Sequence, residues 1–178
     1  ADLVLPYCDG VISAGDLGLS KPVENGVTFV ENAELKAAAA AEVSGQTALA
    51  DDSGLVVTAL GGDPGVSSAR WAGPEEDFYG AMKMIERRLR ENCNRQAHFV
   101  CALCLAWPDG HLETVEGYVY GEFVWPPRGE RGFGYDPVFM AKGYNTTFGE
   151  MEPKEKQIIG HRNDAFKKLV ATCFSAGS

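Results

Sequence analysis

The sequence lacks any apolar run near the ~20 residues that a membrane-spanning helix needs, so no span is expected. Its first residues, Ala1 to Pro6, also lack the basic start and the long apolar stretch of a secretory signal. The chain has 178 residues, of which 45% are hydrophobic and 23% charged. This composition is typical of a globular protein and predicts a single domain over residues 1–178.

Positive charge is scarce, because 16 Lys and Arg face 25 Asp and Glu and leave a net charge of −9. A field of that sign repels nucleic acid, so no nucleic-acid partner is expected, whereas a small phosphorylated ligand is compatible with local cations or metal. The five cysteines are odd in number and do not suggest a disulfide framework. We therefore expect a reducing, cytoplasmic location.

The pattern of apolar residues predicts an α/β fold with a strongly twisted sheet. An Ala-rich segment without Pro or Gly predicts a helix over residues 28–41, and a second helix is indicated by apolar residues at helical spacing over 78–89. Residues 97–107 and 112–125 are β-rich and flank a Pro-Asp-Gly turn, which predicts a long antiparallel hairpin. Shorter strands are expected at 47–50, 55–57 and 138–140. Residues 1–7 are expected to be the end of a helix, and a further helix is expected around 166–173.

The segment Asp51-Asp52-Ser53-Gly54 directly follows an apolar stretch. Two adjacent carboxylates repel one another unless a cation offsets them, and Mg²⁺ is a hard cation that binds Asp and Glu oxygens. Glu24, in the loop before the first long helix, could complete such a metal site. The alternatives are a turn that ends a strand, because Asp, Ser and Gly favour turns, and an ordinary surface glutamate.

The start of the helix after residue 28 carries two further features. Thr28 and Glu31 have the spacing of a capping box, so Glu31 is interpreted as structural. Asn32 and Lys36 lie four residues apart and project from one helix face, where they could meet phosphate oxygens. The simpler interpretation is a solvated helix face.

A glycine-rich loop, Arg131 to Pro137, presents Phe133 and Tyr135, whose rings could stack on a nucleobase. The alternative is a core aromatic next to a tight turn. Further along, Lys156, His161 and Arg162 gather donors suited to a purine carbonyl or a phosphate, and the alternative is a solvated basic patch.

In chain order these segments resemble the inosine triphosphate pyrophosphatase family. The matching stretches are Glu24-Asn25-Gly26-Val27-Thr28-Phe29-Val30-Glu31-Asn32-Ala33, Asp51-Asp52-Ser53-Gly54-Leu55, Gly61-Gly62-Asp63-Pro64-Gly65-Val66-Ser67-Ser68-Ala69-Arg70, Gly132-Phe133-Gly134-Tyr135-Asp136-Pro137 and Gly160-His161-Arg162. The resemblance implies two lobes around a cleft, a long twisted mixed sheet with flanking helices and a homodimer. It also implies Mg²⁺-dependent hydrolysis of ITP, dITP or XTP to the monophosphate and pyrophosphate.

The resemblance assigns roles to residues. Asp52 would be the general base and a metal ligand, and Glu24 would help to hold Mg²⁺. Ser53 would contact substrate, Phe133 would stack on the base, and the base pocket would be lined by Gly134, Tyr135, Asp136, Lys156, His161 and Arg162.

The family's opening strand and its SGNxGK-type phosphate loop have no counterpart in this sequence. We therefore expect the sequence to begin inside the domain. Two alternatives stay open: a catalytically silent module that binds purine nucleotides, which the missing phosphate loop motivates, and a related pyrophosphatase that acts on modified pyrimidines.

Overall fold

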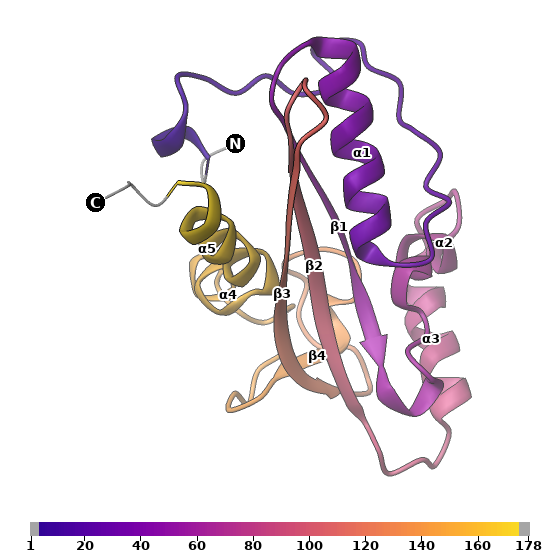
Figure 1. The fold of residues 1–178 in the computed structure, drawn as a ribbon. Coiled ribbons are helices and arrows are strands. Elements are labelled where there is room, and N and C mark those ends of the chain that lie inside the picture. The colour runs from indigo at the N-terminus through magenta and orange to yellow at the C-terminus, as the bar shows by residue number, and fades with distance from the viewer. Residues whose placement is uncertain (1–3, 175–178) are drawn as a thin grey trace. The chain divides into compact units, whose positions relative to one another are not determined.

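The computed structural model describes residues 4–174 and confirms the α/β class (Figure 1). Four strands lie in the order β1-β2-β3-β4. Their bounds are β1 Ala48–Val57, β2 Gln96–Ala106, β3 Leu112–Phe123 and β4 Phe139–Ala141. The helices are α1 Phe29–Ser44, α2 Ser68–Ala72, α3 Phe78–Leu89, α4 Pro153–Ile159 and α5 His161–Cys173. Of the helix end expected at residues 1–7, Leu5–Tyr7 forms a 3₁₀ turn, and residues 1–3 lie outside the described residues.

The predicted hairpin is confirmed as β2 and β3. The turn between them is closed by a hydrogen bond of 2.9 Å from the Trp107 N–H to the His111 carbonyl. β4 then pairs antiparallel with β3, and Phe123 lies opposite Phe139. All four described strands form one antiparallel sheet, so the parallel pair that a mixed sheet requires does not occur within residues 4–174.

The segment Asp51-Asp52-Ser53-Gly54 is neither a turn nor a loop. It lies inside β1, which runs without a break from Ala48 to Val57 in place of the two short strands expected at 47–50 and 55–57. Because β1 is next to β2 in the sheet, inter-strand pairing overrides the turn preference of Asp, Ser and Gly. Successive side chains of a strand point to opposite faces, so Asp51 and Asp52 point apart.

The chain divides into two compact units, each with its own core, in agreement with the two lobes expected. The first unit contains α1 and the ends of the strands nearest to it. Its core is made of small side chains, Ala33, Ala37 and Ala41 of α1 against Ala102, Cys104 and Ala106 of β2. Alanines at every fourth position let the helix backbone approach the strand closely.

The second unit has the larger core, in which aromatic side chains pack against α3. Phe99, Phe139 and Phe148 form a group of mutually contacting rings with centroids 4.7–6.0 Å apart. From α3 the core receives Met82, Ile85 and Leu89, three of the residues whose spacing predicts this helix. The apolar pattern of residues 78–89 is therefore confirmed as a buried helix face.

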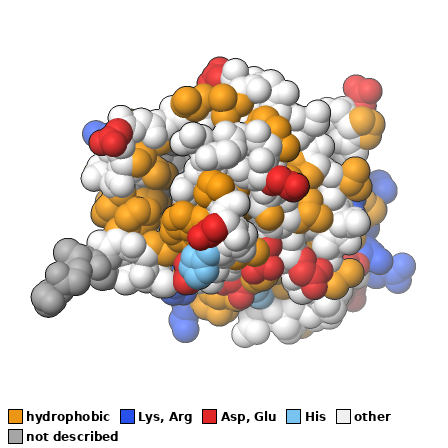
Figure 2. All heavy atoms as spheres, turned by 45° about the horizontal axis from the view of Figure 1, so that its top comes forward, with side chains coloured by type: hydrophobic (Ala, Val, Ile, Leu, Met, Phe, Trp, Pro, Cys, Tyr) orange, Lys and Arg blue, Asp and Glu red, His pale blue; other side chains and the backbone are white. Residues whose placement is uncertain are grey.

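Acidic side chains are scattered over the face shown in Figure 2, whereas Lys and Arg gather mainly toward its edge. This distribution agrees with the excess of 25 acidic over 16 basic residues. Among residues 4–174, no helix has the length and apolar composition needed to cross a membrane.

Candidate functional site

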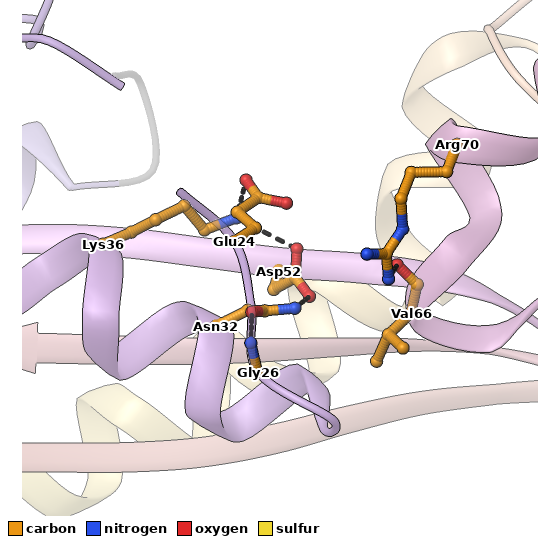
Figure 3. A network of polar contacts seen from close by, with 7 residues as sticks. All are labelled: Glu24, Gly26, Asn32, Lys36, Asp52, Val66 and Arg70. Atoms are coloured by element: carbon orange, nitrogen blue, oxygen red, sulfur yellow. Dashed lines mark hydrogen bonds and ion pairs between the residues drawn. The ribbon is translucent and has the colours of Figure 1, made fainter. Parts of the chain in front are cut away.

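In the first unit, α1, β1 and the loop before α1 bring four polar side chains together, which we call the carboxylate cluster: Glu24, Asn32, Lys36 and Asp52 (Figure 3). The Lys36 ammonium is at its centre. Its Nζ lies 3.1 Å from Glu24 Oε1 and 2.9 Å from Asp52 Oδ1. The two carboxylates that the resemblance assigns to a metal site, Glu24 and Asp52, therefore converge on the Lys36 ammonium.

The local structure explains this convergence. Thr28 caps α1 by accepting a hydrogen bond of 3.1 Å from the Glu31 N–H, so the helix begins at Phe29. This contact confirms the Thr28 half of the expected capping box, whereas the Glu31 carboxylate accepts from the Val27 N–H, one residue before the cap. With the helix start fixed, Asn32 and Lys36 lie one turn apart on the same face. That face meets Asp52 on β1, which is why two helix residues and one strand residue share contacts.

Burial and hydrogen bonding compete in the carboxylate cluster, and burial decides the direction of the pKa shift for Asp52 but not for Lys36. Burial, joined by the negative charge of Glu24, raises the pKa of Asp52 above its ordinary value of 3.8, although hydrogen bonds from Lys36 and Asn32 oppose the shift. For Lys36, burial alone would lower the pKa, but the hydrogen bonds to Asp52 and Glu24 outweigh it and raise the pKa. A carboxylate whose pKa moves toward neutral is a stronger proton acceptor than a fully solvated one.

The donor set of the carboxylate cluster fits a magnesium ion. Two carboxylate oxygens already share one positive charge, that of Lys36. Within the described residues, no group of three or more His, Cys, Asp or Glu side chains gathers to enclose a metal ion. Mg²⁺ is usually held by one or two carboxylates, with water and substrate phosphate oxygens as its other ligands. Glu24 and Asp52 meet that need, and a site that required three protein ligands would not fit.

A second group of predicted residues lies together in the second unit, and we call it the ring cluster: Phe133, Lys156, His161 and Arg162. Phe133 is 64% exposed, so its ring is accessible to a ligand. Lys156 Nζ lies 4.9 Å from the ring centroid and Arg162 Cζ lies 5.4 Å from it. Both distances are within the range of cation–π attraction. Lys156 and Arg162, two of the cations expected near Phe133, therefore do lie beside its ring.

The glycine-rich loop is held in place from inside by Asp136. This carboxylate is buried, pairs with the Lys156 ammonium, and accepts a hydrogen bond of 2.8 Å from the Phe133 N–H. A side chain on Gly132 would collide with Asp136, which explains the glycine at that position. Asp136 therefore has a structural role, because it joins the glycine-rich loop to Lys156.

Tyr135 belongs to the core, the alternative that the sequence left open. It is 3% exposed, its ring meets Phe78 edge-on at 5.4 Å, and its hydroxyl donates to the Ser68 carbonyl at 2.8 Å. Burial raises the pKa of the Tyr135 phenol, which keeps the hydroxyl protonated as a donor. Gly134 beside it has φ +63°, a conformation that favours glycine. The side chain of Tyr135 is therefore not placed to line a pocket, in contrast to the expectation for it.

His161 is buried at 5% exposure and its ring stacks on Phe99 with centroids 5.0 Å apart. Its Nδ1 has no hydrogen-bond partner among residues 4–174. Burial, and then the positive charges of Arg162 and Lys156, lower the pKa of His161 from 6.5 to about 3. Buried polar atoms usually have a hydrogen-bond partner, so this nitrogen of the neutral imidazole is available for a hydrogen bond with a ligand.

The lowered pKa of His161 predicts a pH-dependent stability. In the unfolded chain His161 becomes protonated as the pH falls below 6.5, whereas in the folded chain it stays neutral until the pH reaches about 3. The free energy of unfolding should therefore fall with acidification across this window, by up to about 1.4 kcal/mol per pH unit from this group. Urea unfolding of His161→Asn at pH 7, 6 and 5 should show a shallower fall than the parent. His111→Asn, at an exposed position, should keep the parental slope, and an unchanged slope in His161→Asn would contradict the prediction.

The simpler interpretation of Asn32 and Lys36 from the sequence, a solvated helix face, is wrong. Both side chains contact Asp52 in the carboxylate cluster. Their four-residue spacing was the available signal, but their partner Asp52 lies 20 and 16 residues further along the chain. Ser53 follows Asp52 on β1 and points to the opposite strand face.

The fold and its clusters define a class of protein: an α/β protein in which one unit holds two carboxylates on a shared lysine and the other holds an exposed aromatic ring beside two cations. The Ham1 family model matches residues 8–172, nearly the whole chain, and the chain belongs to the Ham1 family.

Relatives at high identity carry one name. A Zymomonas mobilis protein named dITP/XTP pyrophosphatase is 51% identical over 175 residues, which cover 97% of this chain and 84% of that protein. A Caulobacter vibrioides protein of the same name is 56% identical over 92% of this chain and 86% of its own length. The family expected from the sequence motifs is therefore confirmed.

Solved structures agree with the fold. The Staphylococcus aureus Ham1 protein matches with a TM-score of 0.89 at 37% identity, covering 96% of this chain and 90% of that one. A Mycobacterium abscessus structure, titled nucleoside-triphosphatase and dITP/XTP pyrophosphatase, matches with a TM-score of 0.74 at 38% identity over 84% of this chain and 78% of its own.

Proposed function

We propose that this protein is a nucleoside triphosphate pyrophosphatase that hydrolyses deaminated purine nucleotides, ITP, dITP and XTP, to the monophosphate and pyrophosphate in the presence of Mg²⁺. The observation that carries the proposal is the convergence of Glu24 and Asp52 on one cation. The names of the relatives support the substrate class.

In the proposed reaction, water attacks the α-phosphorus, the bond to the bridging oxygen breaks, and pyrophosphate leaves. Asp52 accepts the proton of the water, a role that its raised pKa favours. Glu24 and Asp52 would hold Mg²⁺, which when bound offsets phosphate charge and makes water more acidic. Lys36 supplies a second positive charge to the phosphates as negative charge shifts to the leaving group.

The ring cluster would recognise the base. Phe133 offers an exposed ring for stacking, and Lys156 and Arg162 carry only hydrogen-bond donors. A 6-oxo purine accepts from these donors, whereas the 6-amino group of adenine presents hydrogens to them. Unpaired donors in a bound complex are costly, so ATP should be disfavoured.

The test is a substrate panel that follows pyrophosphate release with Mg²⁺. We expect kcat/KM for ITP, dITP and XTP to exceed that for ATP by about 10²-fold or more. Arg162→Ala should reduce this ratio, and Lys167→Ala, an exposed cation on the same helix, should leave it unchanged. Equal turnover of ATP, or release of orthophosphate in place of pyrophosphate, would contradict the proposal.

The two alternatives give different results in the same assay. A silent binding module would show calorimetric binding of ITP without product, and a pyrimidine-specific enzyme would prefer modified pyrimidine nucleotides. No contact in the described residues favours either. The homodimer and the cytoplasmic location implied by the resemblance stay predictions, as does the Mg²⁺ dependence.

A further inference from the structure

Asn32 is a buried polar side chain that joins the two carboxylate-bearing segments of the carboxylate cluster. It is 1% exposed and lies near the start of α1. Its Oδ1 accepts a hydrogen bond of 2.9 Å from the Gly26 N–H, and its Nδ2 donates to Asp52 Oδ2 at 3.2 Å (Figure 3). A backbone N–H can only donate and a carboxylate can only accept, so the orientation of this amide is set by its two partners.

The Gly26 contact anchors the segment that carries Glu24. A Cβ added to Gly26 would lie 2.6 Å from Asn32 Oδ1 and 2.8 Å from the Glu31 Cβ, closer than real Cβ atoms approach. The next residue, Val27, donates its N–H to Glu31 Oε2 at 2.7 Å. Two consecutive backbone N–H groups are therefore tied to α1, and Glu24 comes two residues before the first of them.

The Asp52 contact divides the two oxygens of that carboxylate between partners. Oδ2 receives the amide of Asn32, whereas Oδ1 lies 2.9 Å from Lys36 Nζ. Asp52 therefore presents Oδ1 to the Lys36 ammonium, and rotation of the carboxylate would break the hydrogen bond between Oδ2 and Asn32. One side chain controls both the loop of Glu24 and the rotation of Asp52.

We propose that Asn32 is a positioning residue: by holding the Gly26 N–H and Asp52 Oδ2 at once, it fixes the spacing of the Glu24 and Asp52 carboxylates and so sets the affinity of the site for a divalent cation. The inference rests on the proposed Mg²⁺ site. Mg²⁺ demands near-ideal geometry, so preset ligands bind it more tightly than mobile ones. Loss of an outer partner of a metal ligand typically weakens metal binding by about 10–100-fold.

The experiment measures metal binding without turnover. Mn²⁺, a paramagnetic substitute for Mg²⁺, is titrated into nucleotide-free protein and followed by electron paramagnetic resonance, with Mg²⁺ as competitor. Asn32→Leu, which keeps the volume, and Asn32→Ser, which keeps a small polar group, should each raise the Mn²⁺ Kd by about 10–100-fold. Asn163→Leu is the matched control, because the Asn163 amide donates to the Ile158 carbonyl outside the carboxylate cluster.

A second variant disturbs Asn32 by changing its hydrogen-bond partner Gly26. Gly26→Ala should push the amide away and raise the Mn²⁺ Kd in the same range, whereas Gly10→Ala, where a Cβ meets nothing within 4 Å, should not. Hydrogen exchange of the Gly26 N–H should accelerate in Asn32→Leu while the protection of the α1 interior is kept. That local effect separates positioning from general loss of stability.

The outcomes separate this inference from the proposed function. If the parent binds Mn²⁺ and hydrolyses ITP but the folded Asn32 variants bind Mn²⁺ within twofold of the parent, Asn32 does not position the site and the inference fails alone. If the parent itself binds no Mn²⁺ and releases no pyrophosphate, the proposed function fails and this inference fails with it.

Discussion

Replacing Asp52 by Asn is expected to lower kcat for ITP hydrolysis by about 10²–10⁴-fold, the usual contribution of a general base. The carboxamide has nearly the same size and can still accept a hydrogen bond from Lys36, so the fold and nucleotide binding should persist. It cannot take a proton from water, and it carries no charge to hold a cation. Pyrophosphate release in single-turnover and steady-state assays measures the loss, and calorimetry with ITP measures binding.

Asp51→Asn is the matched control for this variant, because it makes the same chemical change one residue earlier on the opposite face of β1. Its effect on kcat should be less than about tenfold, well below the lower bound for a general base. Near-parental turnover in Asp52→Asn would remove Asp52 from the mechanism. Equal losses in both variants would show that the two carboxylates act together, against the alternation of the strand.

A pH profile adds to this test. Because burial raises the pKa of Asp52, the parent should lose activity on acidification at a pH above the ordinary 3.8 of an aspartate. The ionised form is the proton acceptor, so activity is present above this pKa and is lost as the pH falls through it.

The elements with strong local signals could be predicted from the sequence. The Ala-rich composition and the Thr28 cap predict α1, and the observed helix runs from Phe29 to Ser44. The apolar spacing predicts α3, and the Pro-Asp-Gly turn predicts the β2–β3 hairpin. In each case local propensity and tertiary packing favour the same structure.

The course of β1 could not be predicted because local and tertiary preferences disagree there. Asp51, Ser53 and Gly54 favour a turn, but β1 is next to β2 in the sheet and runs unbroken through these residues. The long β2 segment was visible in the sequence, whereas its pairing with residues 51–54 was not. Strand pairing depends on which segment lies alongside, and no local pattern contains that information.

The candidate site shows the same division. The motifs pointed to Glu24 and Asp52 individually, but the link through Lys36 depends on contacts that span 12 and 16 residues. Phe133 and Tyr135 are two residues apart in one loop, but the Phe133 side chain is exposed and the Tyr135 side chain is buried. Gly134 lies between them with φ +63°, a backbone conformation that favours glycine.

Asp136→Ala is expected to lower the free energy of unfolding by about 3 kcal/mol, the lower end of the usual cost of removing one partner of a buried ion pair, because Lys156 keeps some contact with water. The variant leaves Lys156, whose side chain is 18% exposed, without its carboxylate, and it leaves the Phe133 N–H without an acceptor. Urea unfolding followed by circular dichroism measures the loss. The same loosening of the loop should raise KM for ITP more than it lowers kcat, because the loop carries Phe133.

A double-mutant cycle identifies the source of that loss. Lys156→Met removes the cation, so the Asp136→Ala, Lys156→Met pair should lose less than the sum of the single variants. Asp63→Ala is the matched surface control: its pair with Arg88 has both side chains about half exposed and should contribute less than about 1 kcal/mol. Equal losses at Asp136 and Asp63 would show that burial adds nothing to the Asp136 pair. Strict additivity in the cycle would show that Asp136 stabilises the loop through the Phe133 N–H alone, and the ring cluster would then depend on a hydrogen bond to the backbone and not on the ion pair.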